Sequence, residues 1–262
     1  DEYVMVRQHI ESQNLQHLNW GTANAQAVML SFWVKSSQTG TYGCSFYSGR
    51  SSATRVINTT YAISSADTWE KKTITIAGDT AGTVMNNDAD AGLSIIFPLA
   101  AGSNYDGTNS TSWANYSTAN YLGGHAQDGV VTTGSATWLI TGVQLETGST
   151  AGTFDYKTYG EELTECSRYY WKTLADNNKF FPGLGMADTD GNTVILNTPF
   201  PVRMRSAPSS LEQTGTASDY KIRRSTTATC TSVPAFGHAT KDQAATNFIS
   251  SSHGFGDGSA VR

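Results

Sequence analysis

Four aromatic side chains occur in one stretch, residues 103–124, which is otherwise rich in Asn, Ser, Thr and Gly: Tyr105, Trp113, Tyr116 and Tyr121. Asp106 lies inside this stretch, and His125 follows it directly. Aromatic rings stack on the C–H faces of sugars, while amides, carboxylates and hydroxyls pair with sugar hydroxyl groups. The same mixture also suits contact with a protein partner. A third interpretation is that Trp113 and Tyr116 anchor a long loop, and the sequence leaves all three open.

Two oxygen-rich stretches invite comparison with calcium sites. Asp188–Asn192 begins like a calcium-binding loop, but Pro199 stands where such a loop needs a bidentate Glu. We therefore predict a tight turn centred on Asp190 and Gly191. Asn86–Asp90 could ligate a structural Ca²⁺, although its composition favours a solvated loop tip. No other cofactor is indicated.

Motifs for catalysis are absent from the sequence. There is no G-x-S-x-G turn and no glycine-rich phosphate loop, and nothing pairs two carboxylates for glycoside hydrolysis. The histidines show no metal-ligand spacing: His9, His17, His125, His238 and His253. We predict that the protein is not an enzyme.

The composition narrows the range of partners. Charged residues make up 15% of the chain, the net charge is −5, and 28 Ser and 35 Thr supply much of its polarity. The densest basic cluster, Lys221–Arg224, is too small for nucleic-acid binding, and no apolar run reaches the ~18 residues that a membrane span requires. We therefore expect no nucleic-acid partner and no membrane insertion. Three cysteines far apart in sequence, Cys44, Cys166 and Cys230, are expected to be buried thiols.

Alternating apolar and polar residues predict short strands through the first 158 residues. Pro98 is expected to close one of them, and Gly142 is expected to mark a bulge or a close approach of the backbone. One face is expected to carry Leu139, Thr141, Val143 and Leu145. The strands are predicted over Tyr3–Glu11, Val28–Lys35, Gly43–Tyr47, Arg55–Ile63, Lys71–Ala77, Leu93–Phe97 and Trp138–Glu146. About eight short strands without helical periodicity predict an all-β fold, a jelly-roll β-sandwich.

Beyond this sandwich the pattern changes. Acidic residues followed by Leu163, Cys166 and Tyr170 at helical spacing predict a short helix. Strands are predicted over Thr193–Leu196 and Phe200–Arg205, the second of them an edge strand or arm because of its prolines. We predict a sandwich over 1–158, a connecting helix over 159–174 and a second, smaller β-domain over 175–262. This last domain is short, so we expect it to be truncated or completed by oligomerisation. The chain begins without Met and ends within strand-like sequence, and we expect it to be a piece of a longer protein.

A series of motifs, in order, resembles proteins of bacteriophage tails that carry a carbohydrate-binding-module-like jelly roll. The resemblance covers residues 1 to about 210. It rests on His9–Glu11, Leu18–Ala23, Leu30–Ser36, Thr68–Glu70, Ala77–Thr80, Ile140–Glu146, Gly148–Ala151, Phe154, Tyr159–Leu163, Cys166–Tyr170 and Phe200–Pro208. Within these motifs, Trp33 and Trp69 are expected to be core residues.

The resemblance implies a structural protein on the virion surface, a segment of a tail fibre or spike that displays its sandwich for host attachment or assembly. It implies identical subunits, usually three, with other virion proteins as further partners and a host-surface glycan as a candidate ligand. We expect subunit packing in the second region, with its arm over 197–208. The alternatives are a glycan-binding module of a larger polysaccharide-acting protein and a capsid decoration protein. A depolymerase is a third hypothesis, which the missing catalytic motifs disfavour.

Overall fold

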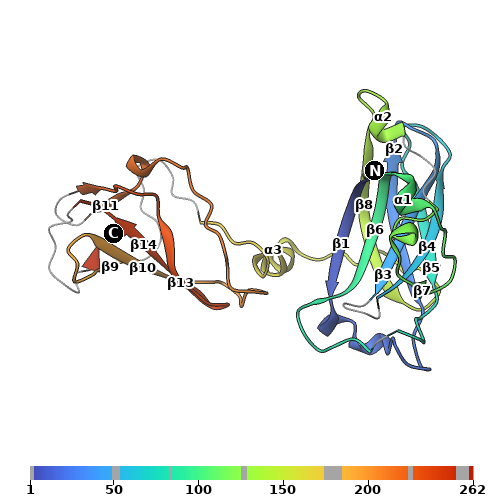
Figure 1. Ribbon diagram of the computed structural model, residues 1–262, viewed down its shortest axis with the longest axis horizontal. Coiled ribbons are helices and arrows are strands. Elements are labelled where there is room, and N and C mark those ends of the chain that lie inside the picture. The colour runs from blue at the N-terminus through green and yellow to red at the C-terminus, as the bar shows by residue number, and fades with distance from the viewer. Residues whose placement is uncertain are drawn as a thin grey trace. The chain divides into compact units, whose positions relative to one another are not determined.

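The computed structural model describes residues 3–48, 54–82, 84–124, 129–173, 185–223 and 227–251, and the backbone of 260–261. The chain divides into two compact units, Asp1–Asp155 and Tyr156–Arg262 (Figure 1). Antiparallel strands dominate both units, and this confirms the predicted all-β fold class. The jelly-roll connectivity stays a prediction.

Two sheets make up the first unit. The five-stranded sheet has the order β1-β6-β3-β4-β7 and the three-stranded sheet the order β5-β2-β8, with antiparallel pairing throughout. The strands are β1 (Tyr3–Glu11), β2 (Val28–Ser36), β3 (Gly40–Ser48), β4 (Arg55–Ile63), β5 (Glu70–Ile76), β6 (Ala91–Ala101), β7 (Ala114–Asn115) and β8 (Trp138–Thr147). Short helical turns join them: η1 (Ser12–Asn14), η2 (Gln16–Leu18), α1 (Ser103–Asp106), η3 (Thr118–Asn120) and α2 (Gly129–Thr132).

The core lies between these sheets because alternate residues of each strand point inward. Phe32 from β2 packs edge-to-face on Tyr61 from β4 and on Phe97 from β6, with ring centroids 5.2 and 5.1 Å apart. Tyr42 stacks on Tyr61, and its hydroxyl hydrogen-bonds to the Ser36 hydroxyl at 3.0 Å. Aromatic packing therefore supplies much of the core, and the buried Tyr42 hydroxyl has a partner.

Two strands differ from their predicted form. β6 does not end at Pro98 but continues past it. Pro98 pairs with Met5 of β1 next to a register shift, and β3 does not pair with this part of β6 on the other side. A proline fits there because no ladder hydrogen bond is lost on its other side. In β8 the predicted bulge is confirmed, since Gly142 has φ +57° and the register shifts opposite β2. The bulge reverses the alternation, so Leu145 packs on the core while Leu139 and Val143 are exposed.

Burial corrects three further expectations. Trp33 and Trp69 are not core residues: they are 43% and 42% exposed, and the Lys35 ammonium lies 5.6 Å from the Trp69 ring centroid. Cys44 and Cys230 are buried as predicted, whereas Cys166 is exposed. Trp33 is exposed because it lies on the outer face of β2, and Cys166 is exposed because it lies on a helix whose side chains mostly face solvent.

The second unit begins with α3 (Tyr159–Ser167), which lies inside the range predicted as helical. Its main sheet has the order β13-β14-β10-β9-β15, and β11 pairs with β12. These strands are β9 (Gly185–Ala187), β10 (Thr193–Pro199), β11 (Lys221–Arg223), β12 (Thr227–Thr229), β13 (Ala235–Ala239), β14 (Gln243–Ile249) and β15 (Ala260–Val261), with the turn η4 (Ala217–Asp219) before β11. Val194, Ile222 and Cys230 form a small core.

Of the two forms predicted for the segment after β10, the edge strand is wrong, and the arm stays a prediction. Phe200–Arg205 has no ladder; instead the backbone N–H groups of Phe200 and Met204 donate to carbonyls of Asp242 and Lys241. Phe200 also packs on Trp171, with ring centroids 5.8 Å apart. Pro199 is the last paired residue of β10, and Pro201 follows it, so the chain cannot continue the hydrogen-bond ladder there.

Both acidic stretches are loops. β9 and β10 pair across Asp188–Asn192, as expected for a tight turn, and Gly191 has φ +70°. The Asp190 carboxylate accepts the backbone N–H groups of Asn192 and Thr193, at 2.9 and 2.7 Å. In 86–90 the Asp88 carboxylate accepts the backbone N–H of Asp90. Within the described ranges, no group of three or more His, Cys, Asp or Glu side chains could hold a metal ion.

Candidate functional site

Five tyrosines gather on the outward face of the five-stranded sheet, and we call them the tyrosine patch: Tyr3, Tyr47, Tyr105, Tyr116 and Tyr121. Tyr121 is central, with ring centroids 6.0 Å from Tyr3, 5.6 Å from Tyr47 and 5.8 Å from Tyr116. All of these contacts are edge-to-face, a favoured aromatic geometry. Tyr3 and Tyr116 remain 39% and 41% exposed, so the patch offers ring surface to a ligand.

The strand register places this patch. One row across β1, β6, β3 and β4 consists of Arg7, Ile96, Ser45 and Asn58. Tyr47 lies two residues after Ser45 on β3, in the next row on the same face. Because the inward residues Ile95 and Phe97 lie in the core, these rows face outward. Tyr105, Tyr116 and Tyr121 come from the segment 102–124, which folds back over this face.

Hydrogen bonds hold that segment in place. The Asn58 side chain accepts the backbone N–H of Ser110 at 2.9 Å and donates to the Ser45 hydroxyl at 2.9 Å. A capping box closes η3, in which the Asn120 side chain accepts the backbone N–H of Ser117 at 2.8 Å. The tyrosines therefore stand on a fixed base.

The described part of the chain places the cation of Arg7 at the patch. The Arg7 guanidinium donates to the Tyr121 hydroxyl at 3.0 Å and is otherwise exposed to solvent. Burial raises the pKa of Tyr121, and the charge of Arg7 opposes that shift. The Tyr121 hydroxyl is therefore neutral at physiological pH. The Arg7 guanidinium that donates to it is exposed and can also bind an anionic or hydroxyl-rich ligand.

Trp113 stands apart from the tyrosines. Its indole packs edge-to-face on Trp20, with centroids 5.2 Å apart, against the core, and its Nε1–H donates to the carbonyl of Ala77 at 2.7 Å. The interpretation of Trp113 as a loop anchor is therefore the one that the geometry supports. For Tyr116 the same interpretation holds only in part, because its ring is 41% exposed.

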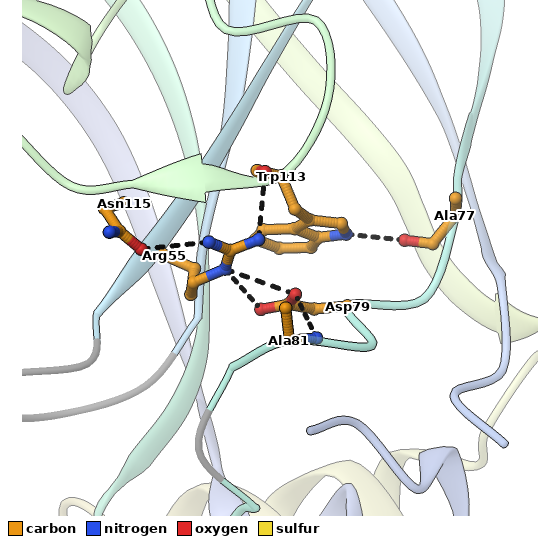
Figure 2. Close-up of polar contacts among 6 residues, drawn as sticks. All are labelled: Arg55, Ala77, Asp79, Ala81, Trp113 and Asn115. Carbon is orange, nitrogen blue, oxygen red and sulfur yellow. Dashed lines mark hydrogen bonds and ion pairs between the residues drawn. The ribbon is translucent and has the colours of Figure 1, made fainter. Parts of the chain in front are cut away.

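A buried ion pair fixes the backbone beside Trp113, as Figure 2 shows. The Asp79 carboxylate, 1% exposed, accepts Arg55 Nε at 3.1 Å, and Arg55 Nη2 donates to the carbonyl of Trp113 at 2.9 Å. Arg55 Nη1 donates to the side-chain oxygen of Asn115, also at 2.9 Å. Arg55 thus joins the loop after β5, strand β4 and strand β7. We call this arrangement the Arg55 clamp.

The structure therefore brings together three of the four sequence-predicted residues, Tyr105, Tyr116 and Tyr121. Sequence reasoning missed Tyr3, Tyr47 and Arg7, although an outward-facing Tyr or Arg in predicted strands was an available signal. Asp106 is half-buried in α1, and His125 lies outside the described residues. Next to Tyr47, in the same row of the sheet, the His9 Nδ1 lies 2.7 Å from the Ser94 hydroxyl. The exposed rings and the Arg7 guanidinium of the patch are groups that can bind a ligand.

Comparison with known proteins gives no further guide to the site. No family model matches the chain, and neither a curated protein nor a solved structure matches it. None of the described helices has the length and apolar character needed to cross a membrane.

Proposed function

We propose that this chain is a structural protein of a bacteriophage particle, a tail-fibre or spike segment that displays its sandwich to attach to a glycan on the host surface. The observation that carries the attachment role is the tyrosine patch with Arg7 beside it. The ordered motif series from His9 to Pro208 supports the virion placement, and the all-β fold class agrees with it.

Chemistry favours a sugar at the patch. Exposed rings of Tyr3 and Tyr116 offer faces for sugar C–H groups, while tyrosine hydroxyls and the Arg7 guanidinium offer hydrogen bonds. The free cation favours an acidic polysaccharide over a neutral one. Because the rings pack on one another and on a sheet, little conformational entropy is lost on binding.

An array of bacterial surface polysaccharides tests the attachment role. We expect the wild-type chain to bind at least one acidic polysaccharide, and we expect Tyr116→Ala and Arg7→Ala each to weaken binding about tenfold, a loss of about 1.4 kcal/mol. Trp33→Ala is the matched control, because Trp33 is equally exposed but lies on the other sheet. Equal loss in all three variants, or no polysaccharide bound by the wild type, would contradict the proposal.

Placement on the particle needs its own experiment. Antibodies raised against residues 1–155 should decorate the tails of purified particles in electron micrographs and should block adsorption to host cells. Antibodies that bind the isolated chain but label the head, or label no particle that contains the chain, would argue against a tail-fibre or spike role.

A further inference from the structure

The rings of the tyrosine patch stand nearly at right angles to one another. Tyr47, Tyr116 and Tyr121 contact each other pairwise, with centroids 5.3, 5.6 and 5.8 Å apart and interplanar angles of 83°, 79° and 89°. Tyr3 meets Tyr121 at 77° and Tyr105 at 75°. None of these pairs is close to coplanar, so the rings do not form a flat platform on which consecutive sugars could stack. They are better suited to a compact group that several rings contact from different directions.

A cation is such a group. The face of an aromatic ring carries partial negative charge, and a cation within about 6 Å of the centroid is attracted to it. Because the centroids of Tyr47, Tyr116 and Tyr121 lie within 5.8 Å of one another, a cation over one of these rings is also close to the other two. Tyr116 is 41% exposed and the other two are partly buried, so ring surface is open to solvent. Aromatic clusters select quaternary ammonium groups, since a primary ammonium is more strongly hydrated.

The charges around the patch favour a ligand that carries both signs. Residues 1–155 contain 12 acidic and 6 basic residues, so this unit opposes the approach of a polymer that carries only negative charge. A cation beside the negative group reduces that repulsion. Arg7 supplies a positive charge at the hydroxyl end of Tyr121, and guanidinium groups bind phosphate oxygens well. An anion at Arg7 and a cation at the rings are therefore separated by about the length of one tyrosine ring.

We propose that the ligand of the tyrosine patch is a phosphocholine group carried by a surface polysaccharide. Its quaternary ammonium contacts the rings of Tyr47, Tyr116 and Tyr121. Its phosphate is bound by the Arg7 guanidinium, and the two carbons between the phosphate oxygen and the nitrogen let both contacts form at once. Because the group is carried by the host glycan, its recognition rests on the attachment role proposed above and names the substituent that is bound.

Titrations of the full chain with small probes test this recognition, with the NMR shifts of the tyrosine rings as the readout. Phosphocholine should bind with a dissociation constant of about 1 mM. Its isostere 3,3-dimethylbutyl phosphate has carbon in place of nitrogen and lacks the positive charge, so it should bind about tenfold more weakly. Arg7→Ala should weaken the binding of phosphocholine more than that of choline, which has no phosphate. Equal affinity for phosphocholine and its isostere, or no binding of phosphocholine, would overturn the proposal.

Substitutions at Tyr116 separate the effect of the ring from that of apolar bulk. Tyr116→Leu should weaken phosphocholine binding about tenfold, and Tyr116→Phe, which keeps the ring, should weaken it less. Tyr156→Leu is the matched control, because Tyr156 is 86% exposed and lies outside the patch. Circular dichroism establishes that the variants are folded. An equal loss in Tyr116→Leu and Tyr156→Leu would contradict the role of the rings.

A polysaccharide that carries phosphocholine, compared with the same polymer after removal of its choline, connects the small probes to attachment. The wild type should bind the first polymer about tenfold more tightly. If the two polymers bind equally well and Tyr116→Ala still abolishes their binding, the phosphocholine assignment is wrong while the attachment role stands. Binding to phosphatidylcholine vesicles without binding to either polymer would overturn the polysaccharide as the source of the group, and the attachment role with it.

Discussion

The outward face of the five-stranded sheet is covered by the chain itself, whereas large apolar side chains on the outward face of the three-stranded sheet lie open to solvent. On the first, Ile96 and Val56 are fully buried although both lie outside the main core. On the second, Trp33, Leu139 and Val143 are 43–45% exposed. The difference comes from one segment, 102–124, which the chain devotes to a single face. An outward-facing position in a strand therefore does not predict an exposed side chain, because a connecting segment can pack over that face of the sheet.

The largest expected effect comes from the Arg55 clamp, which holds the edge of the covered face. Asp79→Ala should lower the free energy of unfolding by about 3–5 kcal/mol, because it leaves the Arg55 guanidinium, only 14% exposed, without its carboxylate. Asp79→Asn keeps an acceptor for Arg55 and should cost less. Urea unfolding measures both, with Trp33→Ala on the open face as the reference. A loss below ~1 kcal/mol for Asp79→Ala would mean that the clamp does not hold this face.

Matched deletions on the two faces test the comparison directly. Ile96→Ala on the covered face should cost about 2–5 kcal/mol, the range for a buried aliphatic side chain. Val143→Ala on the open face should stay within about 0.5 kcal/mol. Chemical denaturation at one pH measures both losses of unfolding free energy. Equal losses would show that the open face is also covered in solution, and the two faces would then no longer differ.

The smallest expected effect concerns the core between the two sheets, in which Cys44 and Tyr61 lie. Burial raises the pKa of the Cys44 thiol above its ordinary value of 9.0, and it also raises the pKa of the Tyr61 hydroxyl above 10.0. Both groups therefore stay neutral in the folded state while the unfolded chain ionises. Stability should be unaffected below about pH 8, and above about pH 9 it should fall by up to about 1.4 kcal/mol per pH unit for each group.

Cys44→Ala isolates the thiol's share of this alkaline loss. The unfolding free energy of this variant, followed from pH 7 to 11, should decline less steeply than that of the wild type. This holds whether or not the two proteins differ in stability at pH 7. Parallel curves for the two proteins would show that Cys44 ionises in the folded state as readily as in the unfolded chain.

Much of the strand framework was predictable, because period-2 alternation marks half-buried strands wherever they lie. β1 and β4 have the predicted bounds, and Gly142 forms the predicted bulge. What alternation could not supply was the effect of that bulge on the residues after it, which turned Leu145 inward. Phe200–Arg205 alternates like a strand but forms no ladder, and ladder formation depends on residues far away in sequence.

The candidate site was predictable only in part, for a related reason. Composition identified the stretch 103–124, but it could not separate a ring that anchors from a ring that faces solvent. Trp113 finds its acceptor at Ala77, and Tyr121 finds its neighbours at Tyr3 and Tyr47. These partners lie 36 or more residues away, so only the folded register brings them together.

The Arg55 clamp also has a consequence for motion. Because Arg55 bonds at once to Asp79, Trp113 and Asn115, the covering segment cannot lift away without breaking two hydrogen bonds to the guanidinium and uncovering a buried ion pair. Local opening of that segment therefore costs more than the opening of a loop that is held by its own backbone alone. Its amides, such as the N–H of Ser110 that Asn58 accepts, should exchange with solvent hydrogen about as slowly as those of the central strands. The loop beneath the tyrosines would then behave as part of the sheet, and a ligand would meet a surface that is already in its bound shape.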